Sequence, residues 1–144
     1  MSVVDLALET RVALLLSGLV FVWALGLGVL KYAQIRRSAE AKAHPYTDIA
    51  HRSALLYAFA IGLIAVFAEL STWPTWVDLS AVLVQVLFFV AAIASYQWHG
   101  MRGDNDNQLR GNPPAAAWFM GALIVGEIGG FLVLLAGFVR AWAG

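Results

Sequence analysis

Four long apolar segments dominate this sequence of 144 residues. A helix crosses the hydrocarbon core of a bilayer with about 20 largely apolar residues, because that core is roughly 30 Å thick. The segments that meet this length cover residues 12–30, 50–68, 79–98 and 115–139. Only 12% of the residues are charged, whereas a soluble domain carries about 25%. The sequence therefore predicts an all-α fold, a membrane-embedded four-helix bundle in which residues 1–144 form a single transmembrane domain.

Basic residues are divided unequally between the two ends of this predicted bundle. The first and third loops, with the helix ends beside them, carry seven: Lys31, Arg36, Arg37, Lys42, Arg52, Arg102 and Arg110. The opposite end carries only Arg11 and Arg140. Cytoplasmic loops carry the excess of Lys and Arg in membrane proteins. We therefore expect the first and third loops in the cytoplasm and both termini outside, in a bacterial inner membrane.

Composition also narrows the function classes. The formal net charge is zero, so no global positive field favours nucleic acid as a partner. Cysteine is absent, which excludes disulfides, thiolate catalysis and zinc–thiolate sites within this sequence. The expected partners are the lipid bilayer, a small hydrophobic substrate and further copies of the same chain.

His51 is the most suggestive residue for chemistry. It follows the first loop at the start of the second apolar segment. Tyr96 lies near the end of the third segment at a similar depth, so the two side chains could share one cavity. A neutral imidazole is a good axial ligand for haem iron. The alternative is a histidine that only caps or hydrogen-bonds near the helix entry. His44 and His99 are weaker candidates, since one lies in a polar loop and the other just past a helix end.

Three arginines near the same end are candidates for holding haem propionates through charge-assisted hydrogen bonds. They are Arg52, Arg102 and Arg110. The alternative is that each only marks the cytoplasmic face.

Glu127 lies at the centre of the fourth apolar segment. A carboxylate in lipid must be neutral or paired, and Gln85 lies at a similar depth as a plausible partner. Gly126 and Gly130 form a GxxxG pair beside it, a pattern typical of close helix packing. A structural or oligomer-contact role is the first interpretation, and a proton path is the second.

The order of these features resembles the styrene oxide isomerase family of small haem-containing membrane proteins. The resemblance covers roughly residues 48–140. It is carried by Ala50-His51 at the start of the second helix, Tyr96 near the end of the third, Asn107-Gln108-Leu109 in the following loop, and Gly111-Asn112-Pro113-Pro114 before the fourth. In the first apolar segment the likeness extends only to hydrophobicity.

The resemblance implies haem b bound by His51, with ferric iron acting as a Lewis acid that rearranges a small hydrophobic epoxide to an aldehyde. It also implies that Tyr96 hydrogen-bonds the oxygen, that Asn107 contributes to the site, and that the chain forms a trimer. The family places an Asn that contacts the substrate six residues after the histidine, where this chain has Tyr57. Tyr57 is therefore the third candidate catalytic residue, with a donor, ligand or steric role left open.

Two other functions remain alternatives. One is a haem-binding membrane protein without this catalysis, such as a sensor, carrier or electron-transfer subunit. The other is a cofactor-free transporter or assembly subunit that uses Glu127 and the GxxxG face.

Overall fold

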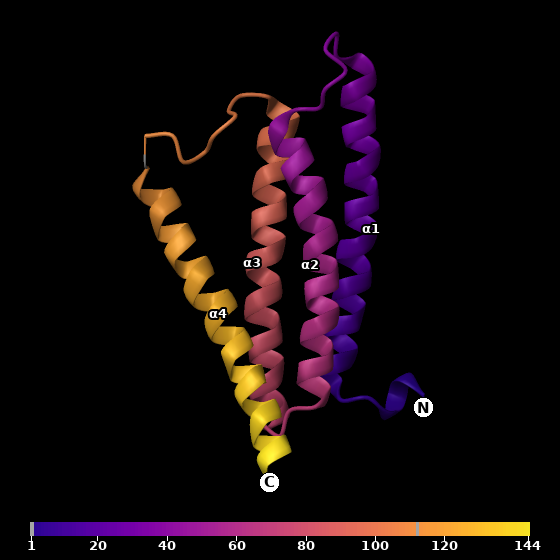
Figure 1. Ribbon diagram of the computed structural model, residues 1–144, viewed down its shortest axis with the longest axis vertical. Helices are drawn as coiled ribbons and strands as arrows, with labels where there is room; N and C mark the ends of the chain where they lie inside the picture. Colours follow the sequence, from indigo (N-terminus) through magenta and orange to yellow (C-terminus); the bar gives the residue numbers. More distant parts are fainter. Residues whose placement is uncertain (1, 112) are drawn as a thin grey trace.

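The computed structural model describes residues 2–111 and 113–144. In these residues four long antiparallel helices follow a short 3-10 helix, η1 (Val3–Asp5) (Figure 1). They are α1 (Leu8–Arg37), α2 (Pro45–Glu69), α3 (Thr75–Arg102) and α4 (Pro114–Ala143). Each is long and apolar enough to cross a membrane. The prediction of an all-α four-helix membrane bundle is confirmed.

Every helix extends beyond the apolar segment that predicted it. At 1.5 Å per residue, helices of 25 to 30 residues are about 38–45 Å long and reach past the hydrocarbon core into the polar interface. α2 begins at Pro45, where a missing backbone N–H costs nothing, and His44 Nδ1 accepts a hydrogen bond from the Tyr46 backbone N–H at 3.2 Å. α3 ends at Gly103, whose φ of 63° is left-handed, a conformation that favours glycine.

Small residues let α1, α2 and α3 approach one another closely. The buried face of α2 carries alanines at five positions: Ala50, Ala54, Ala58, Ala65 and Ala68. Such faces are typical of membrane bundles, where packing replaces the hydrophobic driving force between helices. Two polar contacts join the same helices, since Ser17 Oγ donates to the Ala58 carbonyl at 2.8 Å and Trp23 Nε1 donates to Gln97 Oε1 at 2.7 Å.

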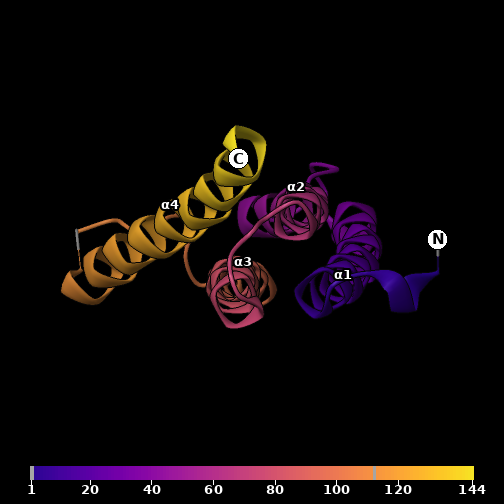
Figure 2. The same cartoon turned by 90° about the horizontal axis from the view of Figure 1, so that it is seen from below.

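α4 is the least enclosed helix. Its buried residues are Leu134 and Gly137, both near its C-terminal end. There the α2–α3 connection holds it, because Trp73 Nε1 donates to the Val133 carbonyl at 2.9 Å and Thr72 Oγ1 donates to the Gly137 carbonyl at 3.3 Å. Towards its N-terminal end α4 leans away from α2 and α3 (Figures 1 and 2).

The loops that join α1 to α2 and α3 to α4 lie at the same end of the bundle (Figure 1). We call this the basic end, because it carries the seven basic residues named above. Both chain termini lie at the opposite end.

Candidate functional site

His51 lies in the second turn of α2 and faces α1. Its Nδ1 is 2.9 Å from the carbonyl oxygen of Ala24. The ring lies against Gly28, where an added Cβ would stand 3.0 Å from His51 Cε1. The side chain is half-buried. α1 therefore holds the imidazole through one backbone carbonyl and one glycine.

This hydrogen bond assigns the tautomer of the neutral imidazole. A carbonyl can only accept, so Nδ1 donates and Nε2 keeps its lone pair. Histidines that bind metals usually donate their other ring N–H to a carbonyl or carboxylate in this way. In His51 the hydrogen bond to Ala24 holds Nδ1 and leaves Nε2 without a hydrogen bond to the described residues. Over the described ranges, no three His, Cys, Asp or Glu side chains group as metal ligands, so iron here would depend on His51 as a single identified ligand.

Arg52 lies beside His51 but is turned toward solvent. Its guanidinium is 3.5 Å from Asp48 Oδ2, and Lys31 Nζ is 2.5 Å from Asp48 Oδ1. The three side chains form an ion-pair cluster at the α1–α2 interface near the basic end. Of the three arginines predicted to bind haem propionates, Arg52 is the one that lies on the same helix turn as His51.

Arg102 and Arg110 are engaged elsewhere, in the third loop. Arg102 Nε is 3.2 Å from Asp104 Oδ2 and its guanidinium lies 5.2 Å from the centre of the Trp98 ring. Arg110 is 3.2 Å from Asp106 Oδ1. Both arginines are exposed. The structure gives them partners of their own and no contact with His51.

The Tyr46 cluster, which consists of His44, Tyr46, Tyr96 and His99, lies at the basic end between α2 and α3. The ring of Tyr46 lies 6.2, 6.0 and 5.5 Å from those of His44, Tyr96 and His99. The sequence placed these residues near one end, but it did not indicate that Tyr46 is their centre. Tyr96 is thus a packing partner of Tyr46.

The third loop is anchored on this cluster. The Gln108 backbone N–H donates to the Tyr46 hydroxyl at 2.6 Å, and Ser95 Oγ donates to Gln108 Oε1 at 3.0 Å. Asn107 itself is exposed, and its Oδ1 accepts from the Leu109 N–H at 3.0 Å within the loop. In the Asn-Gln pair, Gln108 makes the contact with the bundle. Asn112, part of the same sequence motif, lies outside the described residues.

His99 also fixes the loop electrostatically. Its Nδ1 is 3.3 Å from Asp104 Oδ1. The hydrogen bond from His99, assisted by the charge of Arg102, holds the pKa of Asp104 below its usual value.

Tyr57 faces α3. Its ring stacks on Phe89 with the centres 4.2 Å apart. Phe89 in turn lines one pocket with Glu127. Tyr57 is therefore joined to that pocket through Phe89, whereas Tyr96 stacks on Tyr46.

His51 lies on a different face of α2 from Tyr57, since it contacts Ala24 and Gly28 of α1. Ala60, which lines the pocket beside α4, follows His51 by nine residues, which is half a turn from it around the helix. α2 stands between α1 and α4 (Figure 2). His51 thus points toward α1, about 120° around α2 from Tyr57 and half a turn from the pocket beside α4.

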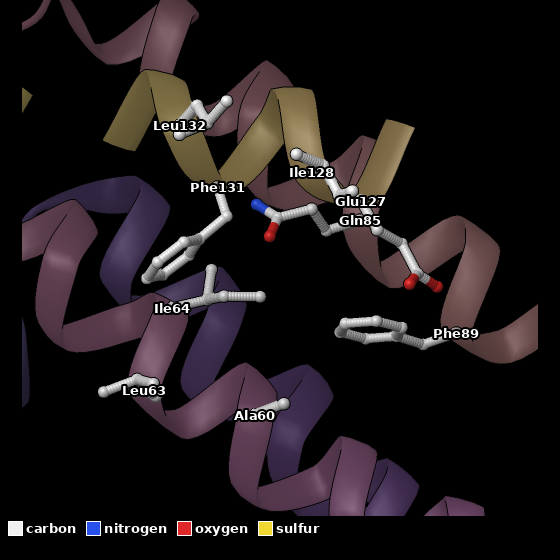
Figure 3. A pocket seen from close by; sticks show the side chains of 9 residues that line it. All are labelled: Ala60, Leu63, Ile64, Gln85, Phe89, Glu127, Ile128, Phe131 and Leu132. Atoms are coloured by element: carbon white, nitrogen blue, oxygen red, sulfur yellow. The ribbon is translucent and has the colours of Figure 1, made fainter. Parts of the chain in front are cut away.

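A pocket of about 360 Å³ opens between α2, α3 and α4. Gln85 and Glu127 lie among its lining side chains, with Phe89 and Phe131 (Figure 3). The two polar residues share this pocket as their similar depth predicted, but Gln85 Nε2 donates to the Ala81 carbonyl at 3.0 Å instead of to Glu127. Glu127 Oε1 is buried without a hydrogen-bond partner among the described residues.

The GxxxG pair packs inside the chain. A Cβ at Gly126 would meet the ring of Phe88, and one at Gly130 would stand 2.8 Å from Gln85 Cγ. Both neighbours belong to α3. The pair therefore lets α4 approach α3 and carry Glu127 to the pocket.

Comparison of the chain with protein-family models, with curated proteins and with solved structures finds no match. The likeness to styrene oxide isomerases thus depends on the sequence motifs alone. The fold by itself does not distinguish functions, since four-helix bundles serve many. The geometry around His51 and around Glu127 is what a functional argument can use.

Proposed function

We propose that this chain is a haem b-binding integral membrane protein that rearranges a small hydrophobic epoxide to an aldehyde. The observation that carries the haem assignment is the Nδ1–H of His51 donating to the Ala24 carbonyl at 2.9 Å. The bond leaves Nε2 as the free ligand atom and fixes the plane of the ring. Gly28 provides the space that this orientation requires.

Bound ferric haem would supply a Lewis acid for the epoxide oxygen, and the rearrangement of epoxide to aldehyde involves no net redox change. His51 would hold the haem, and Arg52, the next residue of α2, would bind a propionate. The hydroxyls of Tyr57 and Tyr96 are the donors for the substrate oxygen. Preorganised donors of this kind are often a large part of catalysis, and the apolar residues around them exclude water.

The catalytic part of this proposal places more than one chain at the site. His51 contacts α1, whereas Tyr57 stacks on Phe89 of α3, so we propose that a ring of copies brings the His51 face of one protomer to the tyrosine face of the next. A trimer with such head-to-tail contacts closes without a symmetric patch. The trimer remains an expectation from the family resemblance.

The orientation in the membrane is part of the same proposal. The seven basic residues of the basic end support a cytoplasmic location for the first and third loops. With that orientation the His51 site lies near the cytoplasmic surface of a bacterial inner membrane.

A haem protein without epoxide chemistry is the second candidate. The observation that favours it is that His51 is hydrogen-bonded to α1, whereas Tyr57 stacks on Phe89 and Tyr96 on Tyr46. A sensor, carrier or electron-transfer subunit needs His51 as a haem ligand, but it needs no hydrogen-bond donor for a substrate on the other side of the haem.

The test is an absorption spectrum of the detergent-purified protein, ferric and then reduced, after expression with ample haem. We expect a Soret band with b-type reduced bands in the wild type, and its loss in His51→Ala. The matched controls are His44→Ala and His99→Ala, which should keep full haem content. A normal haem load in His51→Ala, or a colourless wild-type protein, would refute the haem assignment.

Two further measurements separate the two candidates. A high-spin ferric electron paramagnetic resonance signal and turnover of an aryl epoxide to its aldehyde would support the isomerase. A low-spin signal from two protein ligands, with no turnover, would favour electron transfer.

A further inference from the structure

The pocket between α2, α3 and α4 lies half a turn of α2 away from His51 and has no part in the haem assignment. We propose that this pocket binds a lipophilic organic cation, which is a molecule with one positive charge on an aromatic or aliphatic body. The proposal is independent of haem. It rests on three features of the pocket: Glu127 has no basic partner, the walls are partly aromatic, and the pocket is accessible from the lipid.

Glu127 is the acidic residue that lines the pocket, and no basic residue does. Its Oε1 is buried without a partner, and it takes part in none of the ion pairs of the described residues. Tyr57 of α2 stacks on Phe89, which lines the pocket with Glu127. Among the described residues no basic side chain pairs with Glu127, so the charge of its carboxylate is neutralised by a proton or by a positively charged ligand.

Gln85 cannot take the place of that ligand. Its Nε2 already donates to the Ala81 carbonyl of its own helix. Its Cγ and Cδ lie against Gly130, which fixes the side chain beside α4. The amide therefore borders the pocket as a polar wall and leaves Glu127 Oε1 without a donor.

The remaining lining suits the body of an organic cation. Phe89 and Phe131 contribute aromatic rings to the pocket (Figure 3), and Tyr57 stacks behind Phe89 at 4.2 Å. Aromatic faces attract quaternary and other organic cations through the ring quadrupole. A volume of about 360 Å³ is at the lower end of the range for small-molecule sites. The pocket thus fits a small cation of one or two rings.

The pocket can be reached from the bilayer. α4 leans away from α2 towards the basic end (Figure 1), and its Ile128 and Leu132, which line the pocket, are more than half exposed. An amphiphilic cation concentrates in the membrane and can enter sideways between α4 and α2. A small inorganic cation has no such route and no aromatic partner.

Binding is tested with benzyltrimethylammonium and its neutral isostere neopentylbenzene, in which carbon replaces the charged nitrogen. Affinities are measured by equilibrium dialysis of detergent-purified wild type and Glu127→Gln, with each protein tested against both ligands so that partition into micelles cancels. Benzyltrimethylammonium has no N–H and meets Glu127 through its charge alone. Since removing one partner of a poorly hydrated ion pair leaves the other charge unpaired, Glu127→Gln should weaken cation binding by about tenfold or more. It should change binding of the neutral isostere by less than about twofold.

Phe131→Leu provides a second variant that keeps the carboxylate. It should weaken cation binding by about two- to fivefold, from the loss of one cation–π contact, and leave the neutral isostere unaffected. At protein concentrations where the chain is monomeric, His51→Ala should keep full cation affinity, which separates this site from the haem proposal. Absence of saturable cation binding by the wild type, equal cation affinity of Glu127→Gln and wild type, or equal losses for both ligands would overturn the proposal.

Discussion

Gly28→Ala is the sharpest test of the His51 geometry, because it adds one methyl group at the point where α1 meets the imidazole. The new Cβ would stand 3.0 Å from His51 Cε1 and 3.4 Å from Nδ1. Such contacts are relieved at about 3.4 Å or more, so the ring must move by at least about 0.4 Å. The Nδ1–Ala24 bond is now 2.9 Å and weakens beyond about 3.2 Å. Movement away from α1 therefore breaks or strains it.

The expected loss of stability is worked out by comparing Gly28→Ala with a matched variant, Gly26→Ala. Gly26→Ala adds the same methyl group two residues earlier in α1, where nothing lies within 4 Å. Both substitutions gain about 1 kcal/mol of helix propensity, and this gain cancels in the difference between them. The loss of one hydrogen bond costs about 0.5–1.5 kcal/mol. We expect Gly28→Ala to be less stable than Gly26→Ala by that amount, with neither far below the wild type.

The assay has two readouts. Reversible unfolding in mixed micelles gives the stability difference, and ¹⁵N NMR of the His51 imidazole gives the tautomer. In Gly28→Ala the ring should lose its preference for the Nδ1–H form, and haem affinity should fall about tenfold or more, as for other changes that disturb the support of a metal ligand. Equal stabilities of the two variants, together with an unchanged His51 tautomer, would refute this account of the contact.

Three more predictions concern the basic end. Tyr46→Phe removes the acceptor of the Gln108 N–H, so hydrogen exchange at that amide should quicken by about three- to tenfold, the equivalent of about 1 kcal/mol. Gly100→Ala drives a methyl group into the backbone of α2 and should cost about 1–3 kcal/mol in thermal unfolding. The pKa of Asp104 is lowered, so its stabilising contribution is complete above the ordinary aspartate pKa and is lost as pH falls through the lower folded value. His99→Ala should move the Asp104 midpoint upward in a carbon-detected NMR titration, and an unmoved midpoint would exclude His99 as the cause.

The bundle could be predicted because hydropathy and length determine it. A run of about 20 apolar residues has few alternatives to a membrane helix, and all four such runs became helices. Their ends were less predictable. α1 continues through Lys31 to Arg37, since charged residues outside the hydrocarbon core end an apolar segment without ending the helix. Hydropathy thus located the spans, while caps such as Gly103 determined where helices stop.

The site could be predicted only in part, because helix rotation decides which side chains meet. The depth of Gln85 and Glu127 followed from sequence position, and both line one pocket. The partner of His51 is a backbone carbonyl of α1, which no residue type in the sequence indicates. Similar depth suggested a common cavity for His51 and Tyr96, but depth says nothing about the direction of each side chain, and in the structure His51 contacts α1 and Tyr96 stacks on Tyr46. The sequence does not give the rotation of α2 about its own axis, and that rotation decides which side chains meet.

That rotation makes a double-mutant cycle decisive for the proposed ring of protomers. In a single chain His51 and Glu127 lie across α2 from each other, so cation binding should respond to Glu127→Gln equally with and without His51→Ala, within about 0.5 kcal/mol. If copies assemble with the His51 face of one against the tyrosine face of the next, bound haem would lie beside the pocket of the neighbour. The effects of the two substitutions on cation affinity would then be coupled by more than about 1 kcal/mol, and only at protein concentrations that keep the oligomer intact. Additivity at every concentration would leave haem and pocket as separate sites and would count against epoxide chemistry that uses Tyr57 and Tyr96.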